Sequence, residues 1–142
     1  MNIELMTIKD YDTFYKFWME TPGIGLNSID DSREGIAKYL CRNPDSCFVA
    51  KEDDIITGTI MSGHDGKRGF IYHLAVKPSS RKQGIASELV DKALAFLKKE
   101  GLFRVAILVM GNNEIGNDFW EKRGFVWRDD LKYRDFILNP LE

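Results

Sequence analysis

Cysteine and histidine are scarce in this sequence, and their scarcity limits the chemistry that it can carry. The 142 residues include only two cysteines and two histidines. Cys41 and Cys47 do not have the C-x-x-C spacing of a structural zinc site, so no metal is expected. Both lie in apolar segments, which favours two reduced and packed thiols over a disulfide.

The sequence also lacks a long apolar run and a strong charge of either sign. The first eight residues, Met-Asn-Ile-Glu-Leu-Met-Thr-Ile, have no basic leader region, so we expect no signal peptide, no membrane span and a cytoplasmic protein. The formal net charge is −2, whereas proteins that bind a phosphate backbone normally present a basic field. We therefore expect neither nucleic acid nor membrane as a partner.

The residues that are present predict one soluble domain over residues 1–142, because 44% are hydrophobic and 30% are charged. Alternation and apolar runs predict strands over 3–8, 47–51, 55–61, 71–76, 103–110, 125–128 and 133–138. Helical spacing predicts helices that begin near residues 11, 31, 85 and 113. Asp31 with Glu34 is typical of a capping box at the second of these helices.

The stretch from Ile71 to Ala86 is the most informative part of the chain. A buried strand ends at Pro78, a polar turn follows, and an amphipathic helix begins at Ile85 and is closed by Gly101. The first N–H groups of a helix lack intrahelical partners and lie at its positive end, so they bind anions well. Gly84 would let a phosphate approach the main chain. A simpler alternative is that this glycine only relieves strain in a strand-to-helix connection.

Two common phosphate-binding patterns are absent, since the chain has neither Gly-x-x-x-x-Gly-Lys-[Ser/Thr] nor Gly-x-Gly-x-x-Gly. Val76-Lys77-Pro78 followed by Arg81-Lys82-Gln83-Gly84-Ile85-Ala86 instead resembles the signature of the GNAT superfamily of acyl-CoA N-acyltransferases. A second family mark, Asn113 followed by Phe119-Trp120-Glu121-Lys122-Arg123-Gly124-Phe125, lies at the expected separation. Simple core packing is the alternative role for Phe119 and Trp120.

The resemblance extends over the whole chain because the order of the expected elements also matches the family. It implies an α/β (α+β) GNAT fold: a mixed, mostly antiparallel, twisted sheet of six to seven strands with one splayed strand pair, flanked by four helices. It also implies an N-acetyltransferase that moves an acetyl group from acetyl-CoA directly to a primary amine within a ternary complex.

The resemblance also implies which residues hold the cosubstrate. The main chain of residues 74–76 would pair with pantetheine, residues 81–87 would hold the pyrophosphate, and three later side chains would lie along the pantetheine arm. The expected contacts are Leu74, Ala75, Val76, Arg81, Lys82, Gln83, Gly84, Ile85, Ala86, Ser87, Asn113, Phe119 and Trp120.

The sequence departs from the family at the two positions that often carry the acid and the base. Tyr72 stands where many members have a glutamate base, and Trp120 stands where many have a tyrosine acid. Tyr72 and His73 are the candidate catalytic residues, acting through ordered water, and strand alternation predicts that they point to opposite faces. His64 fits a turn better, and neither cysteine has a base beside it, so no acyl-enzyme is expected.

The acceptor is a small amine or a protein or peptide amine, and the chain is expected to be a monomer or a homodimer. We expect the acceptor pocket at the aromatic first helix, the loop 23–28 and the turn near His64. Asp30, Asp31 and Asp65 would attract a cationic amine or, alternatively, cap helices and turns. A CoA-binding sensor without catalysis and an unrelated nucleotide-binding domain are the rival interpretations.

Overall fold

The computed structural model describes residues 1–139, which fall into two compact units. The first unit is Met1–Leu108 and the second begins at Val109. Each unit is described separately below. The expectation of a single domain over residues 1–142 stays a prediction.

The first unit contains a five-stranded sheet in the order β1-β2-β3-β4-β5. Its strands are β1 (Asn2–Leu5), β2 (Phe48–Glu52), β3 (Ile55–His64), β4 (Gly69–Val76) and β5 (Val105–Ile107). The first three pairings are antiparallel, and β4 and β5 are parallel. The sheet is therefore mixed and mostly antiparallel, as predicted, although it has five strands rather than six to seven.

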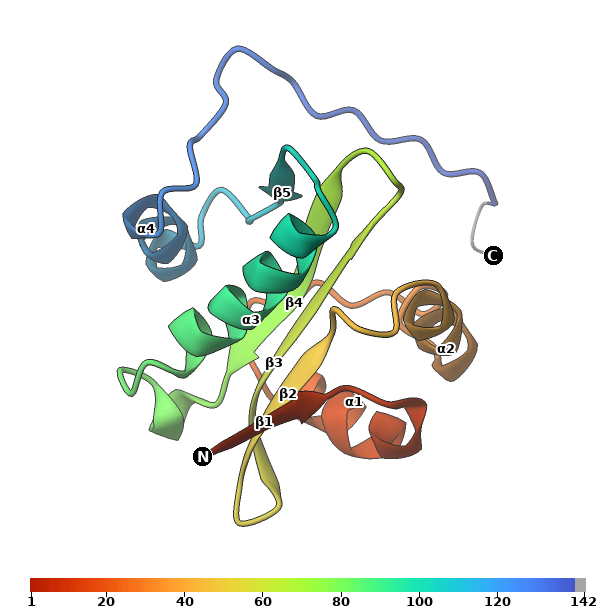
Figure 1. Ribbon diagram of the computed structural model, residues 1–142, viewed down its shortest axis with the longest axis vertical. Coiled ribbons are helices and arrows are strands. Elements are labelled where there is room, and N and C mark those ends of the chain that lie inside the picture. Colours follow the sequence, from red (N-terminus) through yellow and green to blue (C-terminus); the bar gives the residue numbers. More distant parts are fainter. Residues whose placement is uncertain (140–142) are drawn as a thin grey trace. The chain divides into compact units, whose positions relative to one another are not determined.

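Helices cover both faces of this sheet (Figure 1). α1 (Tyr11–Met19) and α2 (Arg33–Arg42) lie on one face and α3 (Ile85–Lys99) on the other. Short 3-10 turns, Ile8–Asp10 and Pro78–Ser80, precede α1 and follow β4. Residues of β3 point alternately to the two helical layers: Gly58 faces α3, whereas Gly63 faces α2. No helix within residues 1–139 combines the length and apolarity that crossing a membrane would need.

The sequence patterns explain why these helices pack as they do. α1 buries residues at positions i, i+3 and i+7, namely Tyr11, Phe14 and Trp18. Along α3, the buried residues Ile85, Leu89, Val90, Ala93 and Leu97 form the predicted apolar stripe. The buried side chains of α1 belong to one core cluster with Val49 of β2 and Met61 of β3.

The prediction for one helix end is confirmed, and the prediction for another is wrong. Gly101, with φ of 83°, closes α3: its N–H donates to Lys98, and the N–H of Leu102 donates to Leu97, as in a Schellman motif. The predicted Asp31–Glu34 capping box is wrong. Ser32 is the N-cap of α2 and accepts from the Gly35 N–H at 3.0 Å, which leaves the Asp31 carboxylate for another partner.

The second unit contains α4 (Glu114–Lys122), which Asn113 caps by accepting from the Gly116 N–H. The Trp120 ring packs edge-on against the rings of Phe119 and Phe125, at centroid distances of 5.1 and 4.7 Å. The predicted strands 125–128 and 133–138 are wrong, because the structure has no strand there. Strand patterns mark chains that fit a sheet surface, but a strand also needs a hydrogen-bonded neighbour, and none of the described residues pairs with these segments.

Candidate functional site

The parallel pairing of β4 and β5 stops half-way along β4. The ladder joins Gly69, Phe70 and Ile71 to Val105, Ala106 and Ile107, and no pair follows. β4 continues for five more residues, Tyr72–Val76. Within the Met1–Leu108 unit, this part of β4 has a strand only on its β3 side. The free edge corresponds to the splayed strand pair that the family resemblance implied.

A β-bulge lies at the point where this free edge begins. Met61 pairs with Tyr72 and Thr59 pairs with Ala75, so His73 and Leu74 of β4 stand opposite Ile60 alone on β3. His73 has φ of 50°, a left-handed conformation that histidine tolerates better than most residues. The His73 carbonyl accepts from the Thr59 hydroxyl at 2.9 Å.

The bulge contradicts the prediction that Tyr72 and His73 point to opposite faces. The Tyr72 ring meets the ring of Tyr39 of α2 edge-on at 5.9 Å, and the His73 ring meets the ring of Trp18 of α1 at 4.6 Å. Both side chains therefore lie on the sheet face that α1 and α2 cover. Alternation fails here because the extra residue of a bulge rotates the strand locally.

Tyr72 keeps its proton at neutral pH. Burial, and then the negative charge of Asp30, raise the pKa of Tyr72 above its ordinary value of 10.0. Tyr72 is 43% exposed, and its ring also stacks on Phe70. A neutral phenol can donate a hydrogen bond but is a poor proton acceptor.

His73 has a carboxylate partner from another part of the chain. Its Nε2 lies 2.6 Å from Oδ1 of Asp31, and both side chains are largely buried. The other oxygen of Asp31, Oδ2, accepts from the backbone N–H of Asn27 at 2.9 Å. The Tyr11 hydroxyl donates to the backbone carbonyl of Asp31. The loop before α2 is thus tied to the bulge of β4.

The predicted anion site has the backbone that such a site needs. Lys82 and Gly84 have φ of 66° and 79°, and Gly84 is the N-cap of α3 without a side-chain cap. The first intrahelical bond runs from the Glu88 N–H to the Gly84 carbonyl at 3.0 Å. The preceding amides of Ile85, Ala86 and Ser87 therefore have no intrahelical acceptor. Arg81, Lys82 and Gln83 are exposed beside them.

The other candidate groups serve the fold. The ring nitrogen Nδ1 of His64 accepts from the Gly66 N–H at 2.9 Å, and Asp65 caps the same turn, as the turn interpretation predicted. Burial raises the pKa of the Cys47 thiol to about 12, so Cys47 supplies no thiolate nucleophile near neutral pH. Tyr11 and Trp18 belong to the aromatic first helix, where the acceptor pocket was expected, and both are members of the core.

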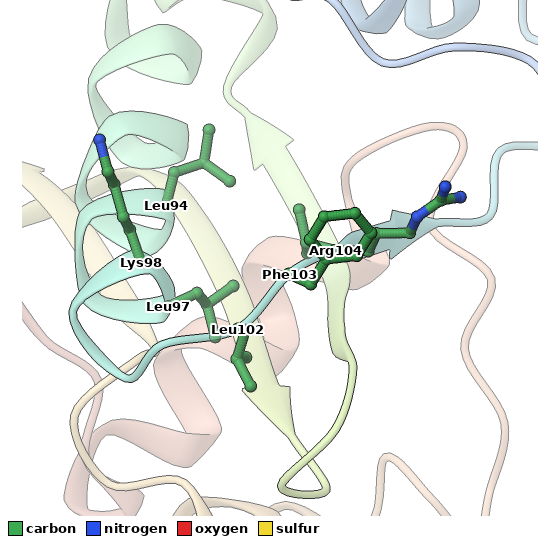
Figure 2. Close-up of a pocket in the computed structure, with 7 residues that line it drawn as sticks. Leu94, Leu97, Lys98, Leu102, Phe103 and Arg104 are labelled. Atoms are coloured by element: carbon green, nitrogen blue, oxygen red, sulfur yellow. The ribbon is translucent and has the colours of Figure 1, made fainter.

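A hollow of about 230 Å³ lies between the end of α3 and the connection to β5 (Figure 2). Leu94, Leu97 and Lys98 line it on the helix side, and Leu102 to Val105 line it on the strand side. It lies near the opposite end of α3 from Gly84, a separation of roughly 20 Å at 1.5 Å per residue. Its lining includes two cations, Lys98 and Arg104, and no carboxylate or imidazole.

Asn113, Phe119 and Trp120 belong to the second unit, so their contact with the cosubstrate stays a prediction. Within that unit, Oδ1 of Asn113 is occupied by the helix cap, and Phe119 and Trp120 pack against each other.

Comparison with known proteins identifies the family. A model of the acetyltransferase (GNAT) family matches residues 11–125, which include the bulge, the free edge of β4 and the start of α3. The chain belongs to the GNAT acetyltransferase family. This membership confirms the enzyme class that the two motifs predicted, an acetyl-CoA-dependent N-acetyltransferase.

Relatives and solved structures agree with this membership. The chain is 29% identical over 142 residues to the acetyltransferase ECA0875 of Pectobacterium atrosepticum, covering 100% of this chain and 99% of the relative. The crystal structure of Ard1 from Thermoplasma volcanium matches with a TM-score of 0.77 at 21% identity, covering 88% of this chain and 82% of that one. The PaiA N-acetyltransferase of Thermoplasma acidophilum, solved with coenzyme A, matches with a TM-score of 0.72 at 22% identity, covering 87% and 89%.

The sequence did not indicate that Asp31 would contact His73. The spacing of Asp31 and Glu34 fitted a helix cap, and nothing local indicated a partner 42 residues away. The only sequence signal for the bulge was weak: position 73 is a histidine, and histidine, asparagine and aspartate are the side chains that most often accept a positive φ.

Proposed function

We propose that this acetyltransferase moves the acetyl group of acetyl-CoA directly to a primary amine, with both substrates bound at once at the free edge of β4. The observation that carries the proposal is the combination of that edge, the bulge that begins it and the uncapped start of α3. Backbone amides can then hold a pantetheine arm along Leu74–Val76 and a diphosphate at Gln83–Ser87, with Arg81 and Lys82 adding charge. The PaiA protein solved with coenzyme A has the same fold.

Transfer requires a polarised thioester and a deprotonated amine. The nitrogen lone pair attacks the carbonyl carbon, the C–N bond forms, and the C–S bond breaks as the tetrahedral intermediate collapses. An amide N–H at the bulge of β4 would stabilise the developing oxyanion, and the thiolate of CoA leaves and takes up a proton. The amine gives up its own proton to a base, for which His73 is the better candidate because Tyr72 stays protonated.

Direct transfer fits the thiols that the chain contains. Cys47 is fully buried, with its pKa raised to about 12. Cys41 is exposed on α2. Cys47 therefore lacks the low pKa that a nucleophilic cysteine needs to carry an acetyl group between two half-reactions.

The proposal predicts amine-dependent release of CoA. Acetyl-CoA is incubated with a polyamine, an amino acid, a lysine peptide, a peptide with a free N-terminus and an aminoglycoside, and free thiol and acetylated product are measured. At least one primary amine should yield both in equal amounts. A tertiary amine of similar charge is the control, because it has no N–H to lose. Binding of acetyl-CoA without turnover of any amine would favour the sensor, and protection by ATP equal to that by CoA would favour a nucleotide-binding domain.

Gly84→Ala should weaken binding of CoA, with Gly101→Ala as a matched control. Both glycines have φ near 80°, and a Cβ at either would meet nothing within 4 Å, so both variants impose similar strain on one end of α3. Only Gly84 borders the proposed diphosphate site. Loss of one charge-assisted hydrogen bond there would raise the Kd of CoA by about 10- to 100-fold. Calorimetry measures both Kd values, and equal values for the two variants would contradict the assignment.

His73→Asn should lower kcat by about 10²- to 10⁴-fold, the usual contribution of a general base. Asparagine also accepts a positive φ, so the bulge should persist. Tyr72→Phe keeps the ring contacts with Tyr39 and Phe70 and should cost much less. Steady-state kinetics on an active amine tests this order, and a larger loss for Tyr72→Phe would assign the proton transfer to Tyr72.

A further inference from the structure

The environment of His73 determines which of its two ring nitrogens is free to accept a proton. Nε2 lies 2.6 Å from Oδ1 of Asp31, slightly closer than the roughly 2.7–2.9 Å that is usual between a nitrogen donor and a carboxylate. A carboxylate can only accept, so Nε2 carries the hydrogen of a neutral ring. Nδ1 is then the unprotonated nitrogen and the only one that can act as a base.

Asp31 is itself held in one orientation. Its Oδ2 accepts from the backbone N–H of Asn27 at 2.9 Å. The side-chain oxygen of Asn27 in turn accepts from the backbone N–H groups of Ile29 and Asp30, which closes the loop on itself. Tyr11 of α1 holds the Asp31 carbonyl. Asp31 is 5% exposed, so water competes little for its carboxylate.

The ring of His73 is also fixed from the helix side. The Trp18 ring meets it at a centroid distance of 4.6 Å and an interplanar angle of 61°. Trp18 Nε1–H donates to the Thr59 hydroxyl at 2.9 Å, and that hydroxyl donates to the His73 carbonyl. The side chain and the backbone of His73 are therefore both anchored to α1.

We infer that Asp31 is a positioning residue for the transfer: it fixes His73 in the tautomer whose Nδ1 accepts the proton of the acceptor amine. The inference rests on the proposed function. It adds Asp31, on the loop that precedes α2, to the proposed site. The buried Asp31–His73 pair would then have a role in the reaction as well as in stability. The pair joins that loop to the strand that carries the thioester-binding amides.

The structure makes a sharp prediction for Asp31→Asn, a change that preserves shape. An asparagine side chain has one oxygen and one NH₂ group. The Asn27 N–H can only donate, so the oxygen must face it. The NH₂ group must then face Nε2 of His73, which can accept only if its hydrogen moves to Nδ1. Asp31→Asn should therefore invert the tautomer and occupy the nitrogen that acts as the base.

Two measurements test the inference. Nitrogen-15 NMR of the imidazole, at a pH where the ring is neutral, should show Nε2–H for His73 in the wild type and Nδ1–H in Asp31→Asn. With an active amine, kcat should fall by about 10²-fold or more, while the Kd of acetyl-CoA stays the same. Asp30→Asn is the matched control. It removes the same charge from the neighbouring residue, which contacts the Asn27 side chain and not His73, and it should keep the Nε2–H tautomer.

The outcomes separate this inference from the proposed function. An Nδ1–H tautomer in the wild-type protein overturns the inference without any variant and without any assay of activity. Unchanged kcat in an Asp31→Asn protein with the inverted tautomer overturns the positioning role and leaves acetyl transfer intact. A wild-type protein that acetylates no amine while His73 keeps Nε2–H contradicts the proposed function instead.

Discussion

The free edge of β4 depends on a single irregularity, the bulge that places His73 and Leu74 opposite Ile60 alone. Parallel pairing with β5 stops at Ile71, one residue before Tyr72, so the bulge lies where β4 loses its second neighbour. A left-handed φ at His73 costs free energy, of order 1–3 kcal/mol for such a conformation, and tertiary contacts must offset it. Thr59, Trp18 and Asp31 supply those contacts by hydrogen bonds and ring packing.

In the proposed mechanism, backbone groups bind the cosubstrate and side chains move the proton. Acetyl-CoA would be held by main-chain groups of β4 and of the start of α3, so few side chains there beyond Gly84 and Ala86 are diagnostic. Proton transfer would depend on two side chains, His73 and Asp31, which the fold brings together across 42 residues. The bulge would contribute to both functions, because His73 lies in the bulge and is also the proposed base.

The sequence predicted the parts of the fold that local chemistry determines. The cap at Gly101, the turn at Asp65 and the apolar stripe of α3 follow from residue type and spacing, and so did the signature from Val76 to Ala86. Local patterns in the sequence could not predict contacts between residues far apart in the chain. Ser32 rather than Asp31 caps α2 because the buried carboxylate is bound to His73, and Tyr72 and His73 share a face because a bulge interrupts alternation. Residues 125–128 and 133–138 have strand-like patterns but no paired neighbour among the described residues.

Hydrogen exchange with and without acetyl-CoA tests the central claim most directly, because it reports on the backbone amides proposed to hold the cosubstrate. Saturating acetyl-CoA should slow exchange at Leu74–Val76 and at Gln83–Ser87 and leave the amides of α1 unchanged. If acetyl-CoA binds but neither segment is protected, the free edge of β4 and the start of α3 are not the cosubstrate site.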